Sequence, residues 1–257
     1  MDIIVCIKQS YDVQQLKFDP KTGEPMLAGA PRKMSDMDRR ALEEALKIKE
    51  NLGGTVKTVT VGPPESRDVV KEIYAMGADE AFVVTDLKLD KADPDLTAKI
   101  IVETIKKIRN FDLILAGAAS TDDYSWQIPA KVAALLDLPF FPNAVSMTVD
   151  GGLVVESDLG DAIYKYKAPL PSVVSVSLEI NEPRIPTLSA ILKASRKQFM
   201  DFYLQDLGLG VVTELEVRKV VMPKVERKNV VVEATDPSKM EDGIKKILDE
   251  LRKENVI

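Results

Sequence analysis

Apolar runs alternate with helix-like patterns along the first half of the chain. Short continuous runs typical of buried strands cover Ile3–Ile7, Val56–Val61, Ala81–Val84 and Leu113–Ala116. Between these runs, apolar residues recur every three to four positions, which predicts amphipathic helices after Ser35, over Ser66–Met76 and from Pro94. Strands that alternate with helices predict right-handed crossovers and a mostly parallel sheet.

Strand patterns without intervening helices follow from Ala144 onward. They cover Ala144–Val149, Leu153–Ser157, Ile163–Lys167 and Val173–Ser177. Asp150-Gly151-Gly152 supplies a turn signal of the hairpin type. We expect these four strands to form an antiparallel extension of the same sheet. The predicted fold class is therefore α/β, with a mostly parallel, doubly wound sheet that is extended by antiparallel strands.

The C-terminal part differs in character, and we expect an α/β domain at 1–205 followed by an arm and a helix at 206–257. Val211–Val232 reads as extended chain, and Met240–Lys253 reads as one amphipathic helix. Its apolar stripe consists of Met240, Ile244, Ile247, Leu248 and Leu251. An arm plus one helix has little core of its own, so it packs back on the domain or wraps around a partner.

Composition restricts the chemistry of the chain. There are 257 residues with no histidine and a single cysteine, Cys6. Ser-His-Asp and Cys-His catalysis, histidine-ligated metals, internal disulfides and iron–sulfur clusters held by this chain alone are therefore excluded. Cys6 lies in the apolar run Ile3–Ile7, where we expect a small buried side chain. Any redox function would depend on a borrowed cofactor.

Charge and hydropathy restrict the classes of partner that we expect for this chain. The formal net charge of −6 argues against general nucleic-acid binding. No apolar run reaches the roughly 18 residues of a membrane span, so we expect no direct membrane insertion. The first residues lack a basic segment followed by a long apolar one, so we expect a cytoplasmic protein without a secretory signal.

One stretch, Leu113–Leu136, combines an apolar strand, a turn of small residues and a helix start. The turn Ala116–Thr121 is followed by two acids and Ser125, and a helix opens near Gln127–Pro129. Free backbone N–H groups and the positive end of a helix dipole favour a phosphate at such a place. The stretch is neither a P-loop nor G-x-G-x-x-G, so an ordinary strand-to-helix loop is the alternative.

A parallel sheet would bring this turn next to two other segments. Ligands of doubly wound sheets collect beyond the carboxyl ends of the strands. In this chain that edge would gather Cys6–Gln9, Val61–Pro63 and Gly117–Gln127.

Five segments resemble the β subunit of the electron transfer flavoproteins, and the similarity covers essentially the whole chain. They are Ile4–Gln9, Ala41–Glu50, Val59–Asp79, Leu115–Pro139 and Leu170–Lys197. The last segment contains NEPRIPTL (Asn181–Leu188) and is the most diagnostic, because no general α/β pattern requires it. The resemblance implies an adenine nucleotide alpha hydrolase-like version of the doubly wound α/β fold.

The resemblance also implies a function and partners. Such a β subunit forms a heterodimer with an α subunit and shares with it a redox FAD, most of whose contacts come from α. The β subunit itself holds AMP, or a second FAD in members that bifurcate electrons. The heterodimer carries electrons between a dehydrogenase and a quinone or ferredoxin-type acceptor. Because the flavin would carry the chemistry, we expect no catalytic residue and no metal site in this chain.

By position, the resemblance places the adenine nucleotide against eighteen residues. These are Cys6 (through its backbone), Ser35, Asp36, Met37, Asp38, Val61, Gly117, Ala118, Ala119, Ser120, Thr121, Asp122, Asp123, Tyr124, Ser125, Trp126, Gln127 and Ile128. We expect Ser125 and the N–H groups around Gln127 to hold phosphate, and Asp122 to hold ribose or orient the turn.

The chain departs from the family pattern at several of these positions. Ala118-Ala119 stands where a basic or polar pair is usual, and Ser35-Asp36 replaces an Asn-Pro pair. Tyr124 and Trp126 are bulky where small or polar residues are usual, so they stack on a ring or fill space. These departures leave AMP and a second FAD as alternatives.

A separate prediction concerns Leu188. Pro183 and Pro186 indicate an exposed turn, and a helix restarts at Leu188. The resemblance implies that Leu188 anchors a partner dehydrogenase, whereas inward packing at the start of its helix is the alternative. A second function from another class is a stand-alone adenine-nucleotide-binding protein of the universal-stress type. NEPRIPTL and the C-terminal arm favour the flavoprotein subunit, since a stand-alone binder needs neither.

Overall fold

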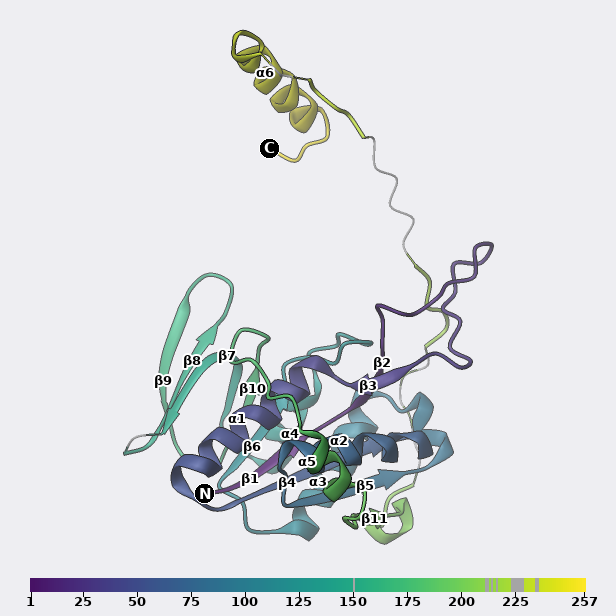
Figure 1. Cartoon of the computed structure of the whole chain (residues 1–257), viewed down its shortest axis with the longest axis vertical. Coiled ribbons are helices and arrows are strands. Elements are labelled where there is room, and N and C mark those ends of the chain that lie inside the picture. The colour runs from purple at the N-terminus through teal and green to yellow at the C-terminus, as the bar shows by residue number, and fades with distance from the viewer. Residues whose placement is uncertain (150, 211–212, 214, 216, 223–228, 234–235) are drawn as a thin grey trace. The chain divides into compact units, whose positions relative to one another are not determined.

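The computed structural model describes residues 1–149, 151–210, 213, 215, 217–222, 229–233 and 236–257 (Figure 1). The chain divides into two units, Met1–Val221 and Met222–Ile257, and each is considered by itself. The expected hairpin turn at 150 and much of the expected extended arm at 211–232 lie outside the described residues. The boundary after residue 205 stays a prediction.

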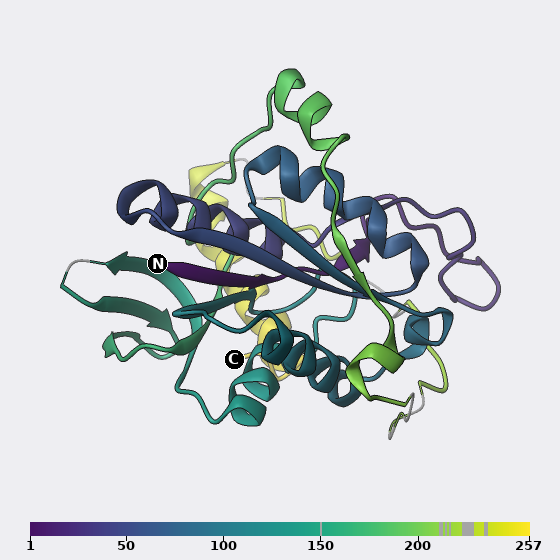
Figure 2. The same ribbon diagram turned by 90° about the horizontal axis from the view of Figure 1, so that it is seen from below.

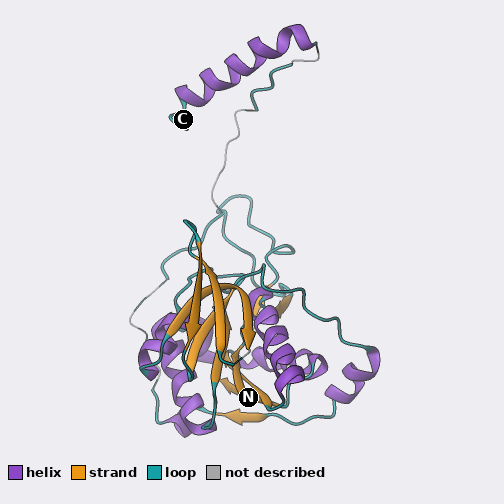
Figure 3. Cartoon of the chain, turned by 90° about the vertical axis from the view of Figure 1, so that its left-hand side faces the viewer, coloured by secondary structure: helices purple, strands orange, loops and turns teal. Residues whose placement is uncertain are grey.

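The first unit is built on one nine-stranded sheet with the order β11-β5-β4-β1-β6-β10-β7-β8-β9 (Figures 1 and 3). Its strands are β1 (Asp2–Cys6), β4 (Thr55–Gly62), β5 (Glu80–Thr85), β6 (Leu113–Gly117), β7 (Phe140–Val149), β8 (Leu153–Asp158), β9 (Ile163–Ala168), β10 (Ser172–Val176) and β11 (Met200–Phe202). Neighbours from β11 to β7 pair in parallel, and β7–β8 and β8–β9 pair antiparallel. The predicted fold class is confirmed. A separate antiparallel ribbon joins β2 (Gln9–Tyr11) to β3 (Arg32–Met34).

Helices cover both faces of this sheet (Figure 2). They are α1 (Asp36–Leu52), α2 (Val69–Met76), α3 (Pro94–Ile108), α4 (Ile128–Leu136) and α5 (Leu188–Ala194), with 3₁₀ turns η1 (Pro64–Asp68), η2 (Leu87–Lys91) and η3 (Leu204–Leu207). Alternate residues of β1 point to opposite faces. Ile3 and Val5 therefore enter the core under α1 and α2, whereas Ile4 and Cys6 enter the core under α3 and α4. Burial on both faces explains why β1 reads as a continuous apolar run.

The position of β10 differs from the expectation. We expected Val173–Ser177 in the antiparallel extension, but β10 lies between β6 and β7 and is parallel to both. After the β7–β8–β9 hairpins the chain returns to the centre of the sheet, where every residue of β10 is buried. A run of buried residues indicates a central strand but does not distinguish its direction, which is why the pattern misplaced it.

Smaller corrections concern helix ends. The stretch expected as one helix over Ser66–Met76 divides into η1 and α2. The apolar residues Leu52 and Leu135 lie in the last turns of α1 and α4 and are exposed. The short β11 and η3 carry too few residues for a periodic pattern and were not expected.

The second unit contains α6 (Pro237–Lys253). Asp236 caps this helix by accepting a 3.0 Å hydrogen bond from the N–H of Ser238, and Pro237 occupies its first turn. The helix therefore begins three residues before the expected start at Met240. Four of the five stripe residues, Met240, Ile244, Ile247 and Leu248, are exposed. None of the described helices combines the length and the apolar character needed to cross a membrane.

Candidate functional site

The winding direction of the sheet reverses between β1 and β6. From β1 the chain passes through α1 to β4 on one side, and it later crosses through α3 to β6 on the other side. Cys6 ends β1 and pairs with Ala116, beside the last residue of β6, Gly117. In doubly wound sheets, the crevice beyond such a reversal is where ligands bind.

Asp38 ties the ends of β1 and β6 to the first turn of α1. Its Oδ2 accepts a 2.8 Å hydrogen bond from the N–H of Lys8, and its Oδ1 accepts a 2.9 Å bond from the N–H of Gly117. Burial raises the pKa of Asp38 to about 7, although both N–H groups act to lower it. Both oxygens of Asp38 therefore hold the strand ends in place, and its expected contact with the nucleotide stays a prediction.

Cys6, the last residue of β1, sits next to this bridge and is buried. Burial, and then the nearby Asp38 carboxylate, raise the pKa of the Cys6 thiol to about 12. The thiol therefore stays protonated at neutral pH and is not a nucleophile.

Lys8 neutralises the two acids of the loop after β6. Its Nζ lies 2.7 Å from Oδ1 of Asp122, 2.6 Å from Oδ2 of Asp123 and 3.4 Å from Oγ of Ser120. Burial acts to lower the pKa of Lys8, but the two carboxylates outweigh it and raise that pKa. Burial acts to raise the pKa of Asp122, but Lys8 and local hydrogen bonds outweigh it and lower that pKa. Lys8 and Asp122 are therefore both charged at neutral pH.

The first half of the loop is fastened to α1. The N–H of Asp36 donates to Oγ1 of Thr121 at 3.1 Å, and the Thr121 hydroxyl donates to Oγ of Ser35 at 3.5 Å. The N–H of Ala119 donates to Sδ of Met37 at 3.3 Å. Ala118 and Ala119 are buried against Met37. The close approach of α1 explains why two alanines, and not larger polar residues, follow Gly117.

The second half of the loop is open. The rings of Tyr124 and Trp126 meet edge-on at 5.5 Å, with 56% and 44% of these residues exposed. Both residues have positive φ, 50° and 60°, which costs a non-glycine residue about 1–3 kcal/mol. Neither ring fills the interior of this chain.

Hydrogen-bond donors are free beside these rings. No described residue accepts a hydrogen bond from the backbone N–H of Ser125, Trp126 or Gln127. α4 begins at the next residue, Ile128, and directs the positive end of its dipole toward them. This half of the loop therefore offers donors, whereas the first half offers the carboxylates paired with Lys8.

The structure gathers most of the eighteen expected residues at one edge. Hydrogen bonds, ion pairs or direct packing join Met37, Asp38, Ser35, Asp36, Gly117, Ala118, Ala119, Ser120, Thr121, Asp122 and Asp123. Cys6 ends β1, Val61 is the last residue but one of the neighbouring β4, and Tyr124 to Ile128 follow along the loop.

Two residues stand apart from that prediction. Leu188 is the first residue of α5, is 74% exposed and is not buried in the core of this chain. Lys8 was expected at this edge as part of Cys6–Gln9, but not as one of the residues that contact the nucleotide. Its only sequence signal is that it follows the end of a central strand, and its acidic partners lie more than a hundred positions away.

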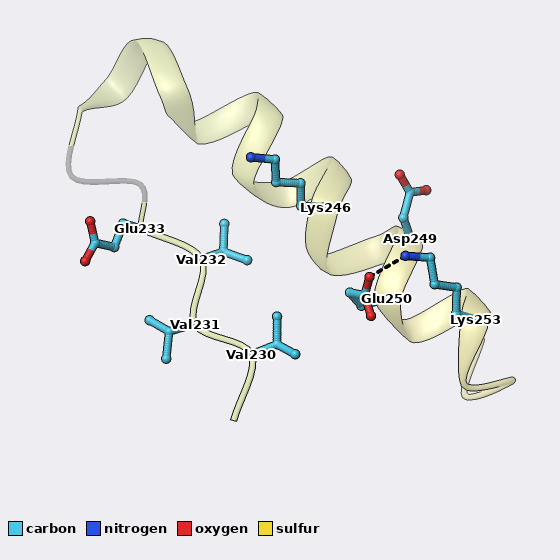
Figure 4. A pocket seen from close by; sticks show the side chains of 8 residues that line it. All are labelled: Val230, Val231, Val232, Glu233, Lys246, Asp249, Glu250 and Lys253. Atoms are coloured by element: carbon cyan, nitrogen blue, oxygen red, sulfur yellow. Dashed lines mark hydrogen bonds and ion pairs between the residues drawn. The ribbon is translucent and has the colours of Figure 1, made fainter. Parts of the chain in front are cut away.

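Two cavities lie elsewhere. One of about 590 Å³ belongs to the second unit, between Val230–Glu233 and the Lys246, Asp249, Glu250 and Lys253 side of α6; Val230 and Val232 point toward the helix (Figure 4). The other, of about 470 Å³, lies between the C-terminal half of α1 and β7. Neither contains an expected site residue. Among the described residues, no group of three or more metal-ligating side chains is present.

Comparisons with known proteins identify the family. The family model described as the electron transfer flavoprotein domain matches residues 27–207. The electron transfer flavoprotein subunit beta of Megasphaera elsdenii is 30% identical over 250 residues, which cover 92% of this chain and 93% of that protein. The chain belongs to the β-subunit family of electron transfer flavoproteins.

Two further relatives agree with this assignment. The electron transfer flavoprotein subunit beta of Thermoanaerobacterium thermosaccharolyticum is 33% identical over 199 residues, covering 77% of this chain and 76% of that protein. The caffeyl-CoA reductase-Etf complex subunit CarD of Acetobacterium woodii is 33% identical over 212 residues, covering 82% and 81%. The chain is therefore an electron transfer flavoprotein subunit, and its family implies flavin association and a partner subunit.

Proposed function

We propose that this subunit is the β half of a cytoplasmic heterodimer that carries electrons between a dehydrogenase and a quinone or ferredoxin-type acceptor. Its redox FAD is shared with the α subunit, and the β1/β6 edge holds AMP or a second FAD. One observation carries the proposal. The loop after β6 has both free N–H donors, at Ser125–Gln127, and carboxylates that Lys8 neutralises, and it lies where the winding of the sheet reverses.

The residues at this edge fit an adenine nucleotide. The three free N–H groups, the Ser125 hydroxyl and the start of α4 are donors that suit a phosphate. The carboxylates of Asp122 and Asp123 would repel a phosphate if they were unpaired, and Lys8 cancels much of that repulsion. Asp122 remains an acceptor suited to ribose hydroxyls. The flavin supplies the redox chemistry when bound, and the residues of this chain bind and orient the nucleotide.

AMP and a second FAD share their adenosine and first phosphate, so the same donors suit both. Bifurcation goes with a second FAD in this subunit. The similarity to CarD, whose name places it in a reductase–Etf complex, supports testing for that second flavin.

Two surfaces would serve the partners. The exposed apolar stripe of α6 and the arm before it, within 206–257, pack on the α subunit. Leu188 and its 92%-exposed neighbour Ile185 dock the dehydrogenase. Apolar side chains this exposed, on a segment that contributes almost nothing to the core, are typical of interface anchors.

The decisive experiment compares the isolated chain with the chain co-expressed with its α subunit. Nucleotides released by denaturation are separated and identified by their molecular mass. Absorbance spectra of both protein samples are recorded before and after reduction. We expect redox-active flavin only in the complex, with one AMP or a second FAD per heterodimer. A full complement of reversibly reduced flavin on the isolated chain would overturn the shared-cofactor proposal. A nucleotide-loaded chain that forms no complex would favour the universal-stress alternative.

A further inference from the structure

Arg184 joins the segment before α5 to two glutamates of α1. Its Nε and Nη2 donate to the two carboxylate oxygens of Glu43 at 2.8 and 3.1 Å, and its Nη1 donates to Oε1 of Glu50 at 2.6 Å. The backbone N–H of Arg184 also donates to Glu43, at 3.0 Å. Only 5% of the Glu43 side chain is exposed. A forked, partly buried pair of this kind fixes orientation as well as distance.

Asn181 makes a second attachment three residues earlier. Its Nδ2 donates to the backbone oxygen of Arg40 and to Oε2 of Glu44, both at 3.0 Å. Ile180, just before it, packs against the core under α1. The segment is therefore attached to α1 at Asn181 and Arg184, and to the core at Ile180.

The side chains of Asn181 and Arg184 hold this segment in place. Residues 181–186 take part in no backbone–backbone hydrogen bond with any described residue. Neither a helix nor a ladder therefore fixes their conformation. Beyond Arg184 the chain leaves α1, and the next apolar side chains, Ile185 and Leu188, are 92% and 74% exposed.

We propose that Glu43 and Glu50, acting through Arg184, are positioning residues that order the docking segment, defined as Glu182–Leu188, before the dehydrogenase arrives. This inference rests on the proposed docking role of Leu188. An anchor on an ordered segment loses less conformational freedom on binding than the same anchor on a free one. The clamp, defined as Arg184 with Glu43 and Glu50, thus raises affinity for the dehydrogenase without touching it.

The test uses the heterodimer with its reducing dehydrogenase as the varied substrate. Arg184→Gln and the milder Glu50→Gln weaken the clamp, and Arg184→Lys keeps the charge but loses the fork. A spin label on Glu182→Cys, an exposed position between the two attachments, reports the mobility of the segment. Cys6, the only native cysteine, is buried and should not react. Glu103→Gln on α3, which loses a 2.7 Å surface pair with Lys106, is the matched control.

We expect the spin label to move slowly in the parent and in Glu103→Gln. In Arg184→Gln it should move fast. The KM for the dehydrogenase should rise about tenfold in Arg184→Gln and less in Arg184→Lys and Glu50→Gln, with kcat and nucleotide content unchanged. A label that stays slow in Arg184→Gln and Glu50→Gln overturns the inference. The inference also fails if Leu188→Ala raises the KM while Arg184→Gln and Glu50→Gln leave it unchanged. In that case the proposed docking role of Leu188 still stands. If Leu188→Ala leaves the KM unchanged, the docking role fails and the inference with it.

Discussion

The backbone N–H of Gly117, at the end of β6, donates a 2.9 Å hydrogen bond to Oδ1 of Asp38, in the first turn of α1. The other carboxylate oxygen of Asp38 holds the N–H of Lys8 beyond β1. One buried side chain therefore sets the spacing of the two strand ends between which the nucleotide is proposed to bind. This contact also explains why residue 117 is a glycine, because α1 approaches the end of β6 too closely to leave room for a side chain.

Gly117→Ala should destabilise the first unit and disturb the site together. A Cβ at this position would lie 2.5 Å from Oδ1 of Asp38 and 2.6 Å from Cβ of Met37, so α1 must move. Overpacking of this kind costs about 1–3 kcal/mol. Urea unfolding and nucleotide content measure the two effects. Gly210→Ala, whose Cβ would meet nothing within 4 Å, is the control and should change neither.

Asp38 should also impose a pH dependence on stability. Its pKa is about 7 in the folded chain and ordinarily 3.8, so the folded state binds more protons between these values. Raising the pH through this window therefore lowers the free energy of unfolding, and the loss is complete above pH 7. Asp38→Asn removes this titration. Its destabilisation relative to the parent should be largest at about pH 4 and below, and smaller by up to about 4 kcal/mol at pH 8. A difference between parent and variant that does not vary with pH would show that Asp38 titrates normally.

The central strands could be predicted from the sequence because a parallel strand that is buried on both faces must be apolar along its buried length, as Ile3–Cys6 of β1 and all of β6 are. The same rule could not place β10. Its burial is a property of the centre of the sheet, whereas its direction depends on how far the chain travels through β8 and β9 before it returns.

The site was predictable in part for a similar reason. The small residues after β6 indicated a close approach, and α1 makes that approach. The pairing of Lys8 with the two acids was missed because a lysine after a strand is ordinarily a solvated residue, and nothing local shows that Asp122 and Asp123 will meet it. The roles of Asp38 as a bridge and of Arg184 as a clamp likewise arise only from tertiary contacts.

Ser125→Ala tests the proposed phosphate contact. Losing one hydrogen bond to a charged group costs about 1.5–3 kcal/mol, so affinity for the nucleotide should fall roughly 10- to 150-fold without unfolding the domain. Titration calorimetry on nucleotide-depleted protein measures the change. Ser125→Asp should be worse, because it places a negative charge where the phosphate belongs. Equal affinities for the parent and Ser125→Ala would remove Ser125 from the site.

Leu188→Ala tests the docking anchor. Truncating an apolar residue that fills a partner pocket typically costs 2 kcal/mol or more, so electron transfer from the dehydrogenase should slow at least about tenfold. Nucleotide content and assembly with the α subunit should be unchanged, because Leu188 lies outside the nucleotide edge. Stopped-flow reduction of the heterodimer measures the rate. An unchanged rate accompanied by a lower Tm would mean that Leu188 supports the fold and does not dock. If assembly is lost instead, Leu188 contacts a permanent subunit.

Trp126 offers a direct report on the nucleotide edge, since it is the only tryptophan of the chain. Trp126 is 44% exposed, its ring lies edge-on to Tyr124, and the residue directly follows Ser125, whose N–H is free. If AMP binds at these donors, its ring or ribose should cover part of the indole, and exclusion of water should shift the emission of the isolated chain to shorter wavelength. Titration with AMP and with FAD separates the two ligands, because flavin would in addition quench the emission. Trp126→Phe should lose the signal, and it should also lose affinity if the two aromatic rings contact the ligand. Emission that stays constant while calorimetry registers AMP binding would place the nucleotide away from this half of the loop.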